Sequence, residues 1–372
     1  MTRKKIYGSM AVLLLLMIGL VGCTGKKADT TSSSSGTTTA NSNINQEPYE
    51  DRQFLLGTYV NIKVYDNGKE QALKDAFARV KELGDKITVN QEGSEVDAVN
   101  EQAGVAPVAV SDDVYRLAKK AYEYSQDSNG GFDMAIGPIT SLWHIGFDDA
   151  RKPSQAEIDA ALKLVDYHKV ILDDEKQTIY LEEKGMKLDL GAIAKGFITD
   201  EVVSLLKDAG VTTAIVDLGG NVYVLGHSVR STPEKAVDWT VGIQDPNQAR
   251  NTTVGQVPET NKSLVTSGIY ERYLVVDGKT YHHLFDPKTG YPFDNGIAGV
   301  TIISDLSIDG DGLSTAVFSM GVKKGLEYVE SLDGVDAIFV TTDDEIFVTD
   351  GVKDEFVLND ESGYTYGDRN KL

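Results

Sequence analysis

The chain has 372 residues, with 36 Lys and Arg against 57 Asp and Glu, so its formal net charge at pH 7 is −21. This charge excludes DNA or RNA as the main partner, because a phosphate backbone is bound by a basic surface. The single cysteine excludes an internal disulfide and a cysteine-rich metal site.

The first segment, residues 1–22, has the pattern of an export signal. Arg3, Lys4 and Lys5 precede an apolar run over residues 10–21, which is shorter than the roughly 20 residues of a membrane-spanning helix. The run ends at Gly22-Cys23 and resembles a bacterial lipoprotein signal, in which the cysteine is lipidated. We therefore predict a signal peptide over 1–22, lipidation of Cys23, and an extracytoplasmic protein anchored to the cell membrane. The alternative is a short membrane anchor with an incidental cysteine.

The next segment, residues 23–52, is predicted to be a flexible tether. Ser, Thr, Gly, Asn and Ala dominate residues 24–45, and almost no apolar residue interrupts them. Such a composition cannot offset the entropy that ordering costs. The folded domain is therefore predicted over residues 53–372.

The folded part contains both helical and alternating patterns. Alternation predicts a strand over 54–65, and helical spacing predicts helices over 70–83, 111–125, 154–164, 194–206 and 315–329. Ser111 and Ser154 are expected to cap two of these helices. Short strands are predicted over 170–172, 178–181, 186–190, 213–218, 238–244, 271–276, 298–303, 336–341 and 345–348. Because strands and helices interleave without a regular β-α-β rhythm, an α+β fold is predicted.

Small residues surround a lysine in the segment over residues 188–197. Gly191, Ala192 and Gly196 would let a ligand approach the backbone closely at the start of the predicted helix. Lys195 lies in the first helical turn, where a cation is unfavourable unless an anion shares the space. The alternative is a tight strand–helix junction with a surface lysine.

Two adjacent histidines stand in the segment over residues 281–292. His282 and His283 are two of only five histidines, and Asp286 follows in a turn signal. Imidazole suits acid–base work near neutral pH. Neighbours in a strand face opposite sides, so at most one of the two should enter any one cleft. The alternative is a plain hairpin loop.

A carboxylate and two hydroxyls share one helical face in the segment over residues 309–320. Asp311, Ser314 and Thr315 are three and four residues apart. Oxygen ligands at this spacing suit a hard cation such as Mg²⁺. The alternative is simple capping of the helix.

These segments occur in an order that resembles a known family. They are Gly57-Thr58, the stretch over 131–143 with Gly-Phe-Asp-Met, Gly-Pro and Leu-Trp, the stretches over 189–196 and 219–221, and those over 283–290 and 311–315. Together they resemble the FAD:protein FMN transferases, the ApbE family, over about residues 53–348. The resemblance implies an α+β fold with two intimately connected lobes and an FAD and metal site in the cleft between them.

The resemblance also implies an activity. Members cleave FAD at its pyrophosphate with Mg²⁺, join FMN through a phosphoester to a Thr or Ser of a target protein, and release AMP. The implied targets are extracytoplasmic FMN-binding proteins with a motif like Asp-Gly-x-Ser/Thr-Gly-Ala-Thr. Two alternatives stay open: an FAD pyrophosphatase that uses the same site to give FMN and AMP, and a surface lipoprotein that binds flavin without chemistry.

Site residues follow from the resemblance position by position. The implied catalytic residue is His283. The implied metal ligands are the Ala192 carbonyl, Asp311, Ser314 and Thr315, with Ser314 a weaker ligand than the second Asp of some members. The implied FAD contacts are Leu56, Asn90, Phe132, Asp133, Asp189, Lys195 and Phe285, with Asn90 where some members have a Tyr.

Overall fold

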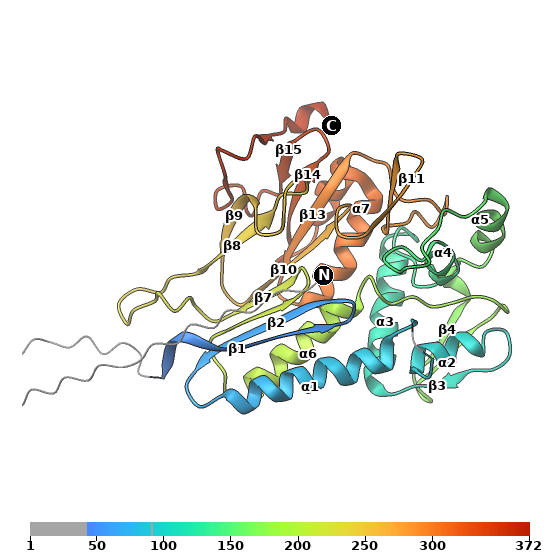
Figure 1. The fold of residues 1–372 in the computed structure, drawn as a ribbon, viewed down its shortest axis with the longest axis horizontal. Helices are drawn as coiled ribbons and strands as arrows, with labels where there is room; N and C mark the ends of the chain where they lie inside the picture. Colours follow the sequence, from blue (N-terminus) through green and yellow to red (C-terminus); the bar gives the residue numbers. More distant parts are fainter. Residues whose placement is uncertain (1–42, 91) are drawn as a thin grey trace, which may run out of the picture. The chain divides into compact units, whose positions relative to one another are not determined.

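The computed structural model describes residues 43–90 and 92–372, and Figure 1 shows their arrangement. The predicted signal peptide, Cys23 and the tether up to residue 42 lie outside the described residues. Within the described part, no helix combines the length and apolar character that crossing a bilayer requires. The α+β class predicted from the sequence is confirmed, since helices and largely antiparallel sheets are both present.

A nine-stranded sheet forms the centre of the fold, in the order β1-β2-β6-β7-β10-β13-β14-β15-β17. All neighbouring pairs are antiparallel except β15 and β17. Its strands are β1 (Ile44–Leu55), β2 (Thr58–Asp66), β6 (Ala214–Leu218), β7 (Asn221–Leu225), β10 (Lys262–Gly268), β13 (Ile297–Ser304), β14 (Asp336–Thr341), β15 (Glu345–Val348) and β17 (Thr365–Tyr366).

Three smaller sheets accompany it. One contains β3 (Val108–Ala109), β5 (Thr178–Leu181) and β4 (Val170–Asp173). Another contains β16 (Val357–Leu358), β9 (Thr253–Glu259) and β8 (Trp239–Gln244). The third is a hairpin of β11 (Tyr273–Val276) and β12 (Lys279–His282).

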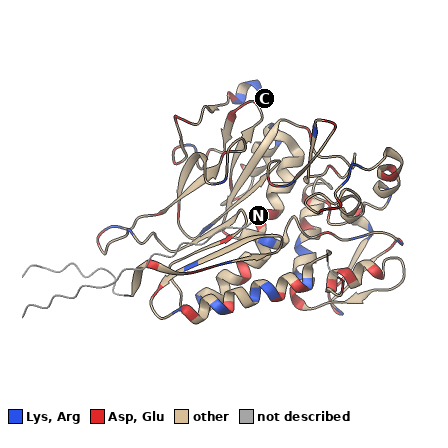
Figure 2. Cartoon of the chain, viewed as in Figure 1, with Lys and Arg blue, Asp and Glu red and all other residues tan. Residues whose placement is uncertain are grey.

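The described part of the chain contains seven α-helices. They are α1 (Glu70–Ile87), α2 (Glu95–Glu101), α3 (Asp112–Asp127), α4 (Gly137–Trp143), α5 (Gln155–Leu162), α6 (Ala194–Asp208) and α7 (Ser307–Val329). In Figure 1, α1 and α6 run side by side beneath β1 and β2. The apolar faces of α1, α3, α6 and α7 bury the main core against the sheet, while α4, α5 and the β11–β12 hairpin enclose a separate cluster around Trp143. Residues of both charges occur along α1 (Figure 2).

The described fold begins earlier than the predicted boundary at Gln53. Strand β1 starts at Ile44, so residues 44–52, predicted as the end of the tether, pair with β2. Most of these residues are exposed because β1 is an edge strand. Its pairing with β2 uses backbone hydrogen bonds, which do not require apolar side chains. The strand therefore has no apolar alternation that would predict it from the sequence.

Two further elements and one helix cap differ from the sequence predictions. Residues 186–190 form no strand ladder and make only an isolated bridge between Lys187 and Ile136. Helix α7 begins at Ser307 instead of 315, so Asp311 lies inside the helix. The glycines at 310 and 312 look like a turn signal, but a Cβ there would meet Val265 at 2.7 Å and Tyr124 at 2.4 Å, so they serve close packing. Ser154 makes its predicted capping box, whereas Ser111 caps α3 without a side-chain bond.

Helices α6 and α7 cross so closely that only a glycine fits at the contact. A Cβ on Gly196 would lie 2.3 Å from the Ser307 carbonyl oxygen. One turn later, the Asp200 carboxylate accepts hydrogen bonds from the backbone N–H groups of Ser307 and Ile308, at 2.7 and 2.9 Å. The first turn of α7 is thereby capped by a side chain of α6. This crossing brings Asp311 of α7 against the first turn of α6.

Replacing Gly196 with Ala should therefore destabilise the fold. The added methyl group meets backbone, which cannot rotate away, so we expect a loss of about 1–3 kcal/mol in the free energy of unfolding. Urea unfolding followed by circular dichroism measures it. The control is Gly299→Ala, where the nearest atoms to a Cβ would be 3.6 Å away. Equal losses in both variants would contradict the tight crossing.

Candidate active site

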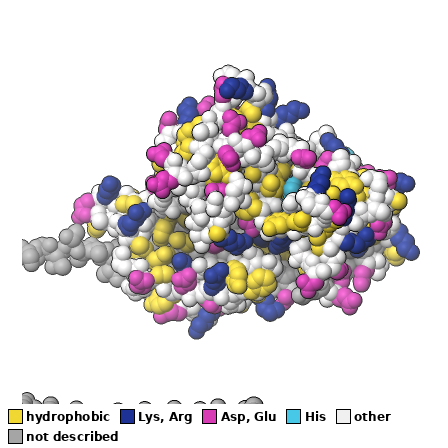
Figure 3. Space-filling model, turned by 45° about the horizontal axis from the view of Figure 1, so that its top comes forward, with side chains coloured by type: hydrophobic (Ala, Val, Ile, Leu, Met, Phe, Trp, Pro, Cys, Tyr) yellow, Lys and Arg dark blue, Asp and Glu magenta, His cyan; other side chains and the backbone are white. Residues whose placement is uncertain are grey.

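A cavity of about 1400 Å³ collects the predicted site residues. Eleven of the twelve that lie in the described part of the chain line it, and Ser314 is the exception. The eleven are Leu56, Asn90, Phe132, Asp133, Asp189, Ala192, Lys195, His283, Phe285, Asp311 and Thr315. Figure 3 shows a face of the molecule where apolar side chains gather around a histidine, next to Lys and Arg side chains.

The tip of the β1–β2 hairpin borders the cavity. Leu56 and Gly57 form its two-residue loop, with φ of 56° and 69°, as in a type I′ turn. This turn usually carries Asn, Asp or Gly, because a left-handed backbone is unfavourable for a residue such as Leu. Strain of this kind gathers at functional sites, where the surrounding structure maintains it. Leu56 therefore occupies a special position at the cavity, while Asn90 lies exposed on the loop after α1.

Phe132, Asp133 and Phe285 form a buried part of the wall. Both rings are almost fully buried, and Phe285 lies 5.7 Å from Trp143 between ring centroids. The Asp133 carboxylate accepts the backbone N–H groups of Ala135 at 2.8 Å and Tyr167 at 3.2 Å. Burial raises the pKa of Asp133 to about 6, against these two hydrogen bonds, which favour the charged form. The Asp133 side chain thus connects this wall to the backbone at Ala135 and Tyr167.

Asp189 is held on two sides. Its Oδ2 accepts the Thr140 hydroxyl at 2.6 Å, and its Oδ1 accepts the Gly191 N–H at 2.9 Å. Residues 186–190 are positioned by the loop before α4, since Asp189 N–H donates to the Met134 carbonyl at 3.0 Å. The carboxylate therefore has a fixed direction at the cavity. The sequence analysis did not identify Thr140 as its partner.

Lys195, Asn221 and Asp311 form a hydrogen-bonded group between α6, β7 and α7. Lys195 Nζ donates to Asn221 Oδ1 at 2.7 Å and to Asp311 Oδ1 at 3.2 Å. Asp311 Oδ2 accepts the Gly196 N–H at 2.8 Å, and only 2% of Asp311 is exposed. Asn221 Nδ2 is buried without a partner among the described residues. Asn221 was not predicted as a site residue, although it ends the Gly-Gly-Asn stretch found in the sequence.

The predicted metal ligands supply only oxygen atoms. Asp311 and Thr315 lie four residues apart on α7, and Ala192 precedes α6 on the same cavity. No group of three or more His, Cys, Asp or Glu that could hold a metal occurs within residues 43–90 and 92–372. A carboxylate, a hydroxyl and a carbonyl nevertheless fit Mg²⁺, which commonly uses few protein ligands and completes its shell with water and phosphate oxygens.

Ser314 does not reach the cavity. Its side chain is fully buried, and its hydroxyl shares a hydrogen bond of 2.8 Å with Ser267 and donates to the Asp311 carbonyl at 2.8 Å. Successive residues of a helix point about 100° apart, so Ser314 faces the sheet when Thr315 faces the cavity. The structure therefore gives Ser314 a packing role and does not place it with the predicted metal ligands.

The two histidines have different surroundings. Both ring nitrogens of buried His282 are bonded: Nδ1 accepts the Leu284 N–H at 3.2 Å, and Nε2 donates to the Phe293 carbonyl at 2.8 Å. His283 lines the cavity, and its Nδ1 lies 3.2 Å from the Arg272 carbonyl. Because a carbonyl only accepts, Nδ1 carries the proton and Nε2 keeps a free lone pair. As expected for neighbours, only one of the two faces the cavity.

Two cations act on His283. Its ring is partly reachable from the cavity, and burial, together with the charges of Arg272 and Lys195, lowers its pKa to about 3. The cavity lining includes four Lys and Arg side chains: Lys81 pairs with Asp85, Lys195 with Asp311 and Arg250 with Glu271. Among the residues that the structure describes, Arg272 has no carboxylate partner. An exposed Arg at the start of a strand carries no signal in the sequence, so this residue was missed.

Comparisons with known proteins agree on one family. A model described as "ApbE family" matches residues 56–339. The FAD:protein FMN transferase of Klebsiella pneumoniae is 39% identical over 310 residues, covering 83% of this chain and 94% of that protein. The enzyme of the same name from Treponema pallidum is 33% identical over 366 residues, covering 95% and 96%. The crystal structure of the ApbE protein of Thermotoga maritima, 31% identical, covers 82% of this chain and 98% of its own with a TM-score of 0.75.

Proposed function

The chain belongs to the ApbE family, and we propose on this basis that it is a transferase that moves FMN from FAD to a hydroxyl of an acceptor protein and releases AMP. One observation carries the proposal: residues from six separate segments, each chosen from the sequence, meet in one cavity. The cavity is larger than the usual site for a small ligand, as a dinucleotide requires. Its walls are apolar at Leu56, Phe132 and Phe285, where a flavin ring can be covered.

The pyrophosphate of FAD needs positive charge in an acidic protein. Lys195 and Arg272 line the same cavity as His283, where the reacting phosphorus would lie. Lys195 is fixed by Asn221 and Asp311, and Arg272 has no internal partner among the described residues. We assign both to phosphate oxygens. Cations fixed in place before the reaction stabilise the charge that builds up in the transition state.

His283 is proposed as the general base. Its Nε2 would take the proton of the acceptor hydroxyl while the hydroxyl oxygen forms a bond to the FMN phosphorus. The bond from that phosphorus to the bridging oxygen breaks, and AMP leaves with the oxygen and its electron pair. The low pKa of His283 keeps the ring neutral at neutral pH, the state in which Nε2 has a lone pair for this proton.

Magnesium is part of the proposal. The Asp311 carboxylate, the Thr315 hydroxyl and the Ala192 carbonyl would hold it, and a bound Mg²⁺ would neutralise charge on the phosphates. The protein residues that orient Asp311 are Lys195 and the Gly196 N–H. Both hydrogen bonds hold the Asp311 carboxylate in one direction at the cavity.

The location and partners are proposals from the sequence. We propose that Cys23 carries a lipid that anchors the protein outside the cytoplasm. The acceptors would then be extracytoplasmic proteins with an Asp-Gly-x-Ser/Thr-Gly-Ala-Thr-like motif. The measurement is mass spectrometry of the protein isolated from membranes of the native host. A lipid-sized mass increase at Cys23 would support this location.

The test of the function is a mass measurement. The full chain is incubated with FAD, Mg²⁺ and an acceptor protein that carries the motif, and the same acceptor with its threonine changed to alanine is the control. One added FMN on the first acceptor alone, with equal AMP, is the expected result. AMP without added mass would instead indicate the pyrophosphatase, and uncleaved FAD would indicate a flavin-binding protein.

A further inference from the structure

Exposed apolar side chains gather at the mouth of the cavity. Ten large apolar side chains are strongly exposed in the described part of the chain, and Phe54, Phe147 and Tyr273 among them line the cavity. Two more adjoin these three: the Tyr59 ring lies 5.5 Å from the Phe54 ring, and Val275 shares a face of β11 with Tyr273. These five residues are called the rim below. Five of the ten strongly exposed large apolar side chains in the described part of the chain thus lie at the mouth of the cavity.

The rim is continuous because three segments meet around one side chain. A Cβ on Gly57, at the hairpin tip, would lie 3.6 Å from the Arg272 guanidinium. A Cβ on Gly146, beside Phe147, would lie 3.1 Å from Arg272 Cδ. Arg272 itself precedes Tyr273. The three rim segments therefore surround the side chain that lies next to His283.

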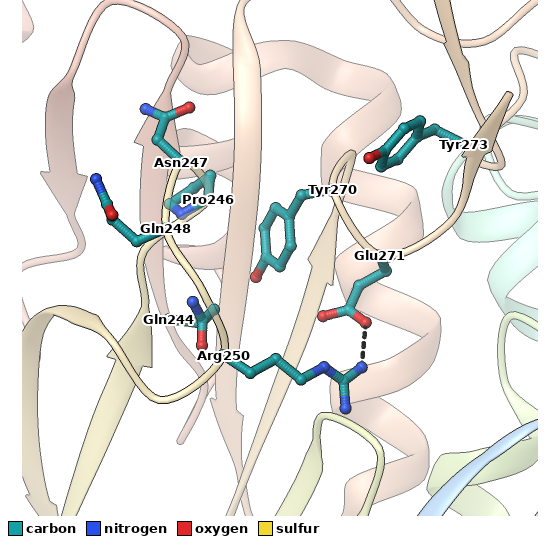
Figure 4. Close-up of a pocket in the computed structure, with 8 residues that line it drawn as sticks. All are labelled: Gln244, Pro246, Asn247, Gln248, Arg250, Tyr270, Glu271 and Tyr273. Atoms are coloured by element: carbon teal, nitrogen blue, oxygen red, sulfur yellow. Dashed lines mark hydrogen bonds and ion pairs between the residues drawn. The ribbon is translucent and has the colours of Figure 1, made fainter. Parts of the chain in front are cut away.

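A second, polar pocket of about 320 Å³ adjoins the rim, and Figure 4 shows its lining. Tyr273 belongs to both spaces, and the Arg250–Glu271 ion pair of 2.7 Å stands between them. The other lining residues are Gln244, Pro246, Asn247, Gln248 and Tyr270. Beside the rim, the Arg52 guanidinium lies 4.1 Å from the Tyr59 ring centre, and among the described residues it makes no ion pair with a carboxylate, although its charge acts on Asp217.

We propose that the rim and the polar pocket form the docking surface for the acceptor protein. This inference rests on the proposed function, because the transfer requires a hydroxyl of a second protein to enter the cavity through this mouth. The occupant that fits is a loop with apolar side chains against the rim, a carboxylate toward Arg52 and a polar side chain in the small pocket. Large apolar patches with a polar border are typical of protein contacts, and Tyr and Arg supply much of their binding energy.

The test replaces two rim residues that do not line the cavity. The full chain with Tyr59→Thr and Val275→Thr keeps strand-forming residues at both positions. A matched control carries Tyr366→Thr and Val357→Thr, which also lie on strands and are 51% and 57% exposed against 49% and 55%. Transfer to the motif-bearing acceptor is measured at saturating FAD, with FAD affinity by fluorescence and direct acceptor binding by surface plasmon resonance.

The rim variant should lower kcat/KM for the acceptor by about tenfold or more and weaken acceptor binding equally, since each 1.4 kcal/mol of lost contact is a factor of ten. FAD affinity should stay the same in both variants, and the control should match the wild type. Unchanged acceptor binding in the rim variant overturns the proposal. The proposal is also overturned if acceptor binding is unaffected and the rim substitutions instead change the sedimentation of the chain alone, or its pelleting with phosphatidylglycerol vesicles. If the wild type binds the acceptor through the rim without transferring FMN, the proposed function fails and the docking surface stands.

Discussion

Replacing Asp311 with Asn should lower the rate of FMN transfer by about 10²–10³-fold, the usual effect of removing one preorganised electrostatic group. The substitution keeps the shape of the side chain but removes the charge that faces Lys195 at 3.2 Å. It also removes the only carboxylate among the proposed Mg²⁺ ligands. Single-turnover transfer measures the rate, and Mn²⁺ binding followed by electron paramagnetic resonance gives a reading that is independent of activity.

A matched control lies two residues away on the same helix. Asp309 contacts Tyr124 at 2.6 Å and Lys120 at 3.2 Å and does not line the cavity. Asp309→Asn should keep transfer and Mn²⁺ affinity near those of the wild type. If Asp311→Asn retained full metal-stimulated turnover, Asp311 would not be a metal ligand.

Replacing His283 with Ala should slow transfer by about 10²–10⁴-fold, the range for loss of a general base. FAD affinity should change little, because no wall contact to the flavin is assigned to this ring. His227→Ala is the control, since His227 is an exposed histidine paired with Asp238 at 3.1 Å. Stopped-flow measurement of transfer and equilibrium fluorescence of FAD separate the two effects.

The pH dependence gives a second reading of His283. A general base is lost as the pH falls through its pKa, and burial followed by the charge of Arg272 lowers that pKa to about 3. His283 should therefore remain neutral from pH 5 to pH 8 and contribute no acid limb to the rate in that range. An acid limb near the ordinary value of 6.5 that disappears in the His283→Ala variant would contradict the low pKa.

Most of the residues that the family resemblance named line one cavity, and they could be named because they lie in short, distinctive stretches of the sequence. Lys195 and Asp311 are far apart in the chain, yet each stands beside glycines: Gly196 permits the α6–α7 crossing, and Gly310 and Gly312 permit close packing of α7 on Val265 and Tyr124. What the sequence could not supply was direction. Ser314 and Thr315 are adjacent hydroxyls, and only the rotation of α7 decides that the first faces the sheet and the second the cavity.

The elements that were missed are those without an apolar pattern. Strand β1 is an exposed edge strand with a polar sequence, and α7 begins in a glycine-containing stretch that looks like a turn. Arg272 and Asn221 gain their roles from partners distant in sequence, His283 and Lys195. These roles depend on tertiary contacts, which a local periodicity in the sequence does not predict.

The length of strand β1 separates Ile44, where the described fold begins, from the cavity. Its 12 residues extend about 40 Å at the usual rise of a strand, with Ile44 at one end and the hairpin tip that borders the cavity at the other. A fluorescent protein or a purification handle fused ahead of Ile44 would thus join the fold at the end of β1 remote from the mouth. The hairpin makes this end suited to immobilising the enzyme on a solid support while large substrates still reach it.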